Sequence, residues 1–434
     1  MSSPAPSGRR IAIASFVGTA IEFYDFYIYG TAAALVFGAV FFPSFSPLAG
    51  TLAAFATYAV GFVARPLGAI LFGHYGDRIG RKRMLIVSLV LMGAATVAVG
   101  LIPSYETIGV LAPVLLVIAR FLQGIGLGGE WGGAVLLATE YAPPGKRGLY
   151  SAFPQLGPAV GFLLGNALFL LLDATMSDET FRTVGWRIPF LASAVLLVVG
   201  YYIRMRIAET PVFQAAMDRQ ERSRVPFVDL LRSQPKTLLL ATLSFILAHT
   251  LFYTVTTFAL SYGTTALHLD RTTMLLAAMV AVAVMGVATL WFAVQSDRIG
   301  RKRLCMASAV LAALWAFPLF WLIDTGNPLL ITLGMTGGLL CFAMLYGPMG
   351  AFLPELFRVR FRYSGASFAY SASGIVGGGI SPLVATDLLA RTGSSAAISA
   401  YVFVIALVCV AGLVPLRETK DADFTDGLTS KTAH

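Results

Sequence analysis

The sequence predicts an all-α membrane protein with twelve transmembrane helices in two related halves of six helices each. Of its 434 residues, 57% are hydrophobic and only 12% are charged, whereas soluble proteins carry about 25% charged residues. Apolar segments long enough to cross a bilayer recur along the whole chain. One seven-residue sequence also occurs once in each half without change. The bilayer is therefore the expected solvent.

Each expected transmembrane helix is an apolar segment of about the 20 residues that a membrane-spanning helix needs. The first follows Arg9 and Arg10 and is too long for the apolar region of a signal peptide, so we expect it to stay uncleaved. The twelve segments are about 11–39, 50–75, 84–102, 108–139, 149–172, 187–206, 237–264, 272–295, 304–323, 328–352, 363–389 and 396–416.

A hydrophilic stretch in the middle of the chain divides the spans into two halves. Residues 207–236 contain three prolines and charges of both signs, as expected of a linker. We therefore predict a first half over 1–206 and a second half over 237–420. Residues 421–434 are polar and are expected to form a tail without regular structure.

The distribution of basic residues between the loops predicts the orientation in the membrane. One set of loops is rich in Lys and Arg, as in 78–83, 146–147 and 298–303, whereas the loops on the other side hold only Arg182, Arg187, Arg271 and Arg391. The basic set and both termini should therefore face the cytoplasm. The net charge of +9 is accounted for by this orientation signal, and we expect no nucleic-acid partner.

An internal repeat links the two halves. The sequence Asp-Arg-Ile-Gly-Arg-Lys-Arg at 77–83 returns at 297–303, and Glu140 and Glu355 each end the fourth span of their half. Two related halves are how many secondary transporters are built, with the binding site near the membrane midplane between them.

The loop Gly73-x-x-Gly76-Asp77-Arg78-x-Gly80-Arg81-Lys82 resembles the signature of the major facilitator superfamily. Its acid and its cations can form contacts across the cytoplasmic face that hold this side shut and break when it opens. We expect such a gate from Asp77, Arg78, Arg81, Glu140, Asp297, Arg301 and Glu355. A purely topogenic role of these charges is the alternative.

A narrower resemblance, to the metabolite:proton symporter family, covers almost the whole chain. The motifs that carry it are Glu22-Phe23-Tyr24-Asp25-Phe26, Ala64-Arg65-Pro66-x-Gly68, Gly126-x-Gly128-Gly129-Glu130-Trp131-Gly132-Gly133-Ala134, Trp186-Arg187-Ile188-Pro189-Phe190 and Glu209-Thr210-Pro211-x-Phe213. Members of this family carry shikimate, α-ketoglutarate, citrate, and zwitterions such as proline and betaine. The sequence Arg362-Tyr363-Ser364-Gly365 is most similar to the shikimate-type members.

This resemblance implies proton-coupled symport of a small organic acid across a bacterial inner membrane by alternating access. Symport of a zwitterion is one alternative, and an uncoupled facilitator or exchanger is another. No phosphate-binding loop of the G-x-x-x-x-G-K-[ST] type occurs, so we expect no ATP. We also expect no enzymatic activity, no metal and no cofactor, and a monomer whose partners are lipid, proton and substrate.

Five ionisable residues lie within expected spans, where a charge is a functional candidate. Glu22 and Asp25 share one face of the first helix and can hold a proton between them, so we expect the coupled proton there, preferably on Asp25. The resemblance implies that Arg120 of the fourth span pairs with Asp25 and is freed for a substrate carboxylate when Asp25 is protonated. Arg65 is a second carboxylate anchor, and Glu130 is a candidate for proton relay or gating.

Other polar and small residues are weaker signals. Tyr27, Gln155, Tyr253 and Tyr370 are candidates to line the substrate cavity. Glycines at every fourth position predict close contact between helix backbones. These glycines are Gly124, Gly128 and Gly132 in the fourth span, and Gly157, Gly161 and Gly165 in the fifth.

Overall fold

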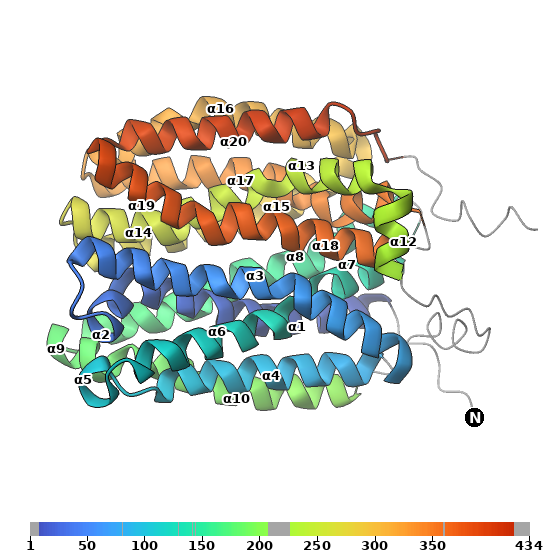
Figure 1. Ribbon diagram of the computed structural model, residues 1–434. Coiled ribbons are helices and arrows are strands. Elements are labelled where there is room, and N and C mark those ends of the chain that lie inside the picture. The colour runs from blue at the N-terminus through green and yellow to red at the C-terminus, as the bar shows by residue number, and fades with distance from the viewer. Residues whose placement is uncertain are drawn as a thin grey trace, which may run out of the picture.

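The computed structural model describes residues 8–79, 81–128, 130–140, 142–143, 145–206, 226–358 and 361–420. Regular structure within these ranges is helical, and no strand occurs in them. Figure 1 shows the long helices running side by side along one direction. Residues 207–225 of the expected linker and the whole expected tail, 421–434, lie outside the described part of the chain.

The first half starts with a helix that continues through a π-helical stretch, and it ends with a bent pair of helices. Its elements are α1 (Gly8–Ala32), η1 (Ala33–Phe37), α2 (Gly38–Phe41), α3 (Pro47–Ile79), α4 (Arg81–Leu101), α5 (Tyr105–Ile108), α6 (Leu111–Gly128), α7 (Glu130–Glu140), α8 (Arg147–Thr175), α9 (Asp178–Thr180), η2 (Phe181–Gly185) and α10 (Arg187–Arg206).

The second half follows the same plan, with π-helical stretches in its first and fifth spans. Its elements are α12 (Pro226–Ser233), α13 (Pro235–Tyr253), η3 (Thr254–Phe258), α14 (Ala259–Ser261), η4 (Tyr262–Ala266), α15 (Arg271–Ile299), α16 (Arg301–Asp324), α17 (Pro328–Leu356), α18 (Arg362–Gly374), η6 (Ile375–Ile380), α19 (Ser381–Thr392) and α20 (Ser395–Leu413).

These elements form twelve membrane-spanning segments. Ten helical segments among the described residues are long and apolar enough to cross a bilayer, and the pair Asp178–Gly185 and Arg187–Tyr202, bent by 41°, forms an eleventh. The apolar helix Ile86–Leu101, within α4, supplies the twelfth. Large apolar side chains such as Val287 and Leu329, 74% and 80% exposed, lie on the outer surface, as expected of helices that face lipid. The predicted fold class is confirmed.

The two ends of the bundle carry different parts of the chain. α1 begins near Gly8 and α20 ends at Leu413 at the same end, on the right in Figure 1, which we call the terminal end. α2, α5, α9 and α14 lie at the opposite end, which we call the far end. The halves meet where α8 packs on α15 and where α3 packs against η6 and α18.

Glycines bring α3 and α6 into backbone contact. A Cβ at Gly128 would lie 1.9 Å from the carbonyl oxygen of Arg65, and one at Gly124 would lie 2.1 Å from that of Gly61. In the same way α8 lies against α1, because a Cβ at Gly161 would be 2.6 Å from the Tyr24 nitrogen. The predicted backbone contacts therefore exist at Gly124, Gly128 and Gly161, whereas Gly132 and Gly165 lie against side chains. The contacts between α3 and α6 place Arg65 and Arg120 in one region of the first half.

We predict that Gly128→Ala destabilises the protein, because the added methyl group would push α3 away from α6. Overpacking of this kind costs about 1–3 kcal/mol. Gly133→Ala is the matched control, since a Cβ there meets only the Tyr363 ring at an ordinary 3.5 Å. Thermal melting in detergent should show a lower transition temperature for Gly128→Ala alone. Equal transition temperatures for the two variants would show that the contact is not a tight one.

Candidate functional site

Two buried arginines share one aromatic ring at the centre of the first half. Arg65 on α3 and Arg120 on α6 are 2% and 0% exposed. Their guanidinium carbons lie 4.2 Å and 4.0 Å from the centroid of the Phe26 ring, which α1 supplies. Tyr29 and Tyr58 add further rings at 4.2 Å and 4.5 Å from Arg120. These cation–π contacts partly replace the water that each cation loses in the membrane.

Neither arginine has a carboxylate partner among the residues that the structure describes. Within the described part of the chain, the Nε and Nη2 atoms of Arg65 and the Nη2 atom of Arg120 have no hydrogen-bond partner. Buried N–H donors that stay unpaired are costly, and more so when they carry charge. This part of the first half therefore holds two positive charges and unpaired N–H donors, a combination that fits an anion.

Asp25 does not form the expected direct pair with Arg120. Its Oδ1 atom accepts a 2.5 Å hydrogen bond from the Ser193 hydroxyl of α10, and the Thr96 hydroxyl of α4 lies beside the same carboxylate. Arg120 instead donates from Nη1 to Gln123 Oε1 at 3.0 Å. Polar side chains of α4 and α6 thus stand between the acid and the cation. Glu22, one turn before Asp25, is also buried, 1% exposed.

Aromatic residues of both halves surround the two arginines. The Tyr253 ring of α13 lies 5.1 Å from Phe62 of α3 and 6.2 Å from Tyr27 of α1, measured between centroids. Tyr370 of α18 stacks on Trp131 at 3.9 Å with the planes 5° apart. The structure therefore brings the expected Tyr27, Tyr253 and Tyr370 to the interface between the halves.

The Gln155 side chain forms hydrogen bonds with residues of two other helices. Its Oε1 atom accepts a 2.9 Å hydrogen bond from Trp131 Nε1, and its Nε2 atom donates to the Tyr346 carbonyl oxygen at 2.7 Å. Because Tyr346 belongs to α17 and Gln155 to α8, the amide joins the two halves.

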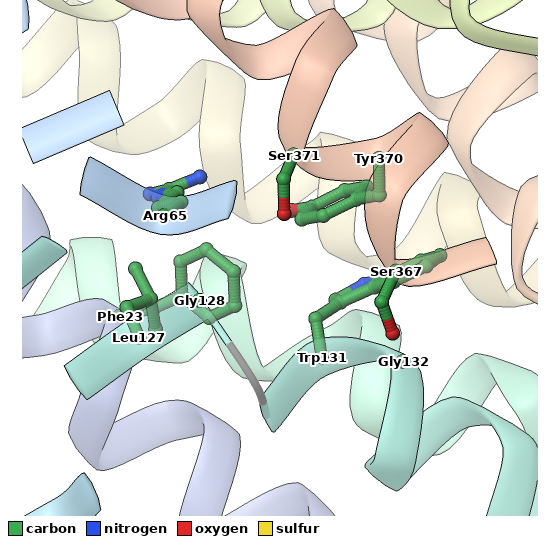
Figure 2. A pocket seen from close by; sticks show the side chains of 9 residues that line it. All are labelled: Phe23, Arg65, Leu127, Gly128, Trp131, Gly132, Ser367, Tyr370 and Ser371. Atoms are coloured by element: carbon green, nitrogen blue, oxygen red, sulfur yellow. The ribbon is translucent and has the colours of Figure 1, made fainter. Parts of the chain in front are cut away.

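A small pocket lies between the halves next to Arg65 (Figure 2). Arg65 lies on one side of it, and Tyr370 and Ser371 of α18 lie on the other. The Ser367 hydroxyl, also on α18, is buried without a hydrogen-bond partner. The remaining residues that line the pocket are Phe23, Leu127, Gly128, Trp131 and Gly132. One half therefore contributes a cation to this pocket and the other contributes hydroxyl groups.

The expected gate residues of the second half form a buried cluster at the terminal end. Arg301 donates to both carboxylate oxygens of Glu355, at 2.8 Å from Nε and 3.2 Å from Nη2, and pairs with Asp297 at 3.0 Å. Arg147 of the first half lies 3.7 Å from Glu355. Asp297 also accepts from the backbone nitrogens of Gly148 and Leu149, at 2.9 Å and 3.2 Å. Asp297 therefore caps the first turn of α8 across the interface.

The matching acidic and basic residues of the first half lie in described helices, but their side chains are outside the part that the structure describes. These are Asp77, Arg78, Arg81 and Glu140, together with the expected relay residue Glu130. Their role in the gate stays a prediction.

Two residues just after α20 complete the cluster and were missed in the sequence. Glu418 accepts from the backbone nitrogens of Arg301 and Lys302 at 2.8 Å and 3.1 Å, and so caps the start of α16. The Thr419 hydroxyl donates to Glu355 at 2.7 Å. The only signal in the sequence was a charged segment directly after the last apolar run, which resembles an ordinary helix end.

A second link between the halves, also not anticipated, lies at the far end. Asp173 at the end of α8 binds the Arg271 guanidinium and accepts from the Thr272 hydroxyl at 2.9 Å, both at the start of α15. Arg271 also pairs with Asp178 at 3.3 Å. The α8–α15 pair is therefore connected at both of its ends.

Comparison with known proteins shows which family the sequence matches. The family model of the Major Facilitator Superfamily matches residues 15–382 and 247–430. The inner membrane metabolite transport protein YhjE of Escherichia coli is 44% identical over 423 residues, 96% of each chain. The shikimate transporter of the same organism is 39% identical over 384 residues, 88% of each chain. Its proline/betaine transporter is 33% identical over 427 residues, 95% of this chain and 84% of that protein.

Solved structures share the fold. The proton:xylose symporter XylE, bound to 6-bromo-6-deoxy-D-glucose, matches with a TM-score of 0.76 at 18% identity over 95% of this chain and 96% of its own. A partially occluded inward-open conformation of XylE from E. coli gives a TM-score of 0.72 at 18% identity over 96% and 99%. At such identities the likeness concerns the fold alone.

We predict that the two acids at the ends of the α8–α15 pair control opposite sides of the pocket. Asp297→Asn weakens the link at the terminal end, and Asp173→Asn weakens the link at the far end. A cysteine introduced by Ser371→Cys reports access to the pocket through its reaction with a membrane-impermeant maleimide. In vesicles of the two orientations, each acid variant should raise the labelling rate from its own side only. Equal effects from both sides would contradict separate gates.

Proposed function

Because the chain belongs to the Major Facilitator Superfamily, in which its relatives are transporters and not enzymes, we propose that it carries a small organic acid together with a proton. The halves rock about the central site, which is open to one side of the membrane at a time. The observation that carries the proposal is the pair of buried arginines with unpaired donors and no carboxylate partner among the described residues.

A carboxylate fits these donors better than a neutral sugar does. A guanidinium presents two parallel N–H groups that match the two oxygens of a carboxylate, and burial strengthens this charge-assisted pairing. On this proposal Arg65 and Arg120 hold the carboxylate, while Tyr27, Tyr253 and Tyr370 contact the rest of the molecule. Gln155 positions Trp131 at the pocket. Shikimate, which one relative carries by name, is a candidate.

A zwitterion such as proline or betaine is the second candidate. A relative is named as a proline/betaine transporter, and the aromatic side chains around the site provide π faces that bind organic cations. Its carboxylate would use the same arginines. An uncoupled facilitator or exchanger differs from both in moving no proton.

Asp25 takes the coupled proton on this proposal, with Glu22 one turn away as the other carboxyl group. Both are buried in α1, within the half that holds the two arginines. Glu130 and the gate residues Asp77, Arg78, Arg81, Glu140, Asp297, Arg301 and Glu355 would pass the proton onward or close one side.

On this proposal the terminal end and both termini face the cytoplasm, as the basic loops predict. The protein is then a monomer in a bacterial inner membrane. The halves would then be 1–206 and 237–420, with 207–236 as a cytoplasmic linker.

Reconstitution in liposomes that contain a pH-sensitive dye tests the proton. We predict that one of shikimate, α-ketoglutarate, citrate and betaine acidifies the lumen on addition, and that Asp25→Asn abolishes this acidification. Asp387→Asn is the control, because Asp387 forms an exposed pair with Arg391 on the surface. Uptake of labelled substrate without acidification, at equal rates in wild type and Asp25→Asn, would identify an uncoupled facilitator.

Arg65→Lys tests the carboxylate anchor. Lysine keeps the charge but loses the bidentate geometry, and loss of a buried charged partner costs about 2–5 kcal/mol in binding. The affinity for the transported acid should therefore fall by at least about tenfold, measured by isothermal titration calorimetry or substrate protection. Arg391→Gln, which alters an exposed cation, should bind as wild type does. Unchanged affinity in Arg65→Lys would assign the carboxylate to another residue.

A further inference from the structure

We propose that Thr96 and Gln123 form a hydrogen-bond relay through which the protonation state of Asp25 controls Arg120. The inference rests on the proposed function, in which Asp25 takes the coupled proton. Thr96 and Gln123 are positioning residues in this scheme, because they act on the substrate through Arg120.

The relay follows from two buried hydrogen bonds, one within α6 and one between α6 and α4, and from the proximity of α4 to the Asp25 carboxylate of α1. Arg120 Nη1 donates to Gln123 Oε1 at 3.0 Å, and Gln123 Nε2 donates to the Thr96 hydroxyl oxygen at 2.8 Å. Thr96 in turn lies beside the Asp25 carboxylate. Thr96, Gln123 and Arg120 are each 0% exposed, and Asp25 is 3% exposed. Solvent therefore does not compete for these bonds.

The direction of each bond is fixed by chemistry. A guanidinium can only donate, so the amide oxygen of Gln123 must face Arg120, and its NH₂ group must face Thr96. The Thr96 hydroxyl accepts this bond and keeps one proton to donate. Two acceptors are available to that proton: the Met92 carbonyl oxygen, at 2.9 Å one turn earlier, and the Asp25 carboxylate.

The choice between these acceptors depends on the charge of Asp25. An ionised carboxylate is the stronger acceptor and draws the Thr96 proton. Hydrogen bonds in a chain reinforce one another, so Thr96 then accepts more strongly from Gln123, and Gln123 holds Arg120 more tightly. When a proton binds to the Asp25 carboxylate, the Thr96 hydroxyl turns to Met92 and the chain weakens.

Arg120 is the last residue of the hydrogen-bond relay and the one that would contact the substrate. Its Nη2 atom already lacks a partner, whereas Nη1 is held by Gln123. Once Gln123 releases its hold, both Nη atoms can bind the two oxygens of a carboxylate. Loss of the negative charge on Asp25 also leaves the positive charges of Arg65 and Arg120 less balanced. Proton binding thereby prepares the site for the anion, although the acid and the cation do not touch.

Thr96→Val, which keeps the side-chain shape and removes the hydroxyl, separates this relay from a purely structural role. The measurement is the number of protons moved per substrate in the liposome assay, together with substrate exchange at equal pH on both sides. Thr96→Val should lower the proton-to-substrate ratio and raise the KM of proton-driven uptake by about tenfold, as expected for a lost hydrogen bond to a charged network. Exchange at saturating substrate should keep its rate.

Three comparisons decide the outcome. Thr96→Ser should restore the ratio, and Thr289→Val should leave it unchanged, because Thr289 is a buried threonine bonded in the same way to its own helix, at Met285. A wild-type ratio in Thr96→Val, or a parallel loss of uptake, exchange and melting temperature, would overturn the relay. A wild-type ratio in Asp25→Asn would instead overturn the assignment of the proton to Asp25.

Discussion

The constraint on which the site depends is a pair of guanidinium groups that share the Phe26 ring and have no carboxylate partner in the described part of the chain. An arginine at bilayer depth costs at least about 2.5–3.5 kcal/mol, and a desolvated cation–π contact recovers about 2 kcal/mol. The surrounding rings offset this cost but do not satisfy every N–H group, and donors of Arg65 and Arg120 stay unpaired among the described residues. On the proposed function, an anion that enters between the halves would pair with both groups, which would explain why the cations lie beside the interface.

The backbone contact between α3 and α6 is what allows two like charges to be held so close. With Gly124 and Gly128 against the carbonyl oxygens of Gly61 and Arg65, the helices approach without side chains between them. Any larger residue would separate the helices and move Arg65 away from the ring. The glycines of α6 therefore determine how close the two positive charges lie as well as how tightly the helices pack.

The sequence was sufficient to predict the spans and to find the charged residues buried within them, because hydropathy and a charge within an apolar run are both local signals. The last span was expected at about 396–416 and is formed by Ser395–Leu413. The expected pair of Asp25 and Arg120 was wrong, because Thr96 and Gln123 are ordinary polar residues whose positions between them depend on three-dimensional packing. The capping of α16 by Glu418 joins residues 117 positions apart, and no local pattern encodes it.

The location of each contact bears on the order in which the proton binds and the substrate is released. Asp25, Thr96, Gln123 and Arg120 belong to α1, α4 and α6, so a change along the proposed relay requires no movement between the halves. The pocket beside Arg65, in contrast, takes residues from both halves, and the α8–α15 pair is fixed at both ends. Protonation can therefore precede any opening, whereas release of the substrate needs one of the two end contacts to break. On the proposed mechanism, the proton binds within the first half, and the substrate moves when the two halves separate.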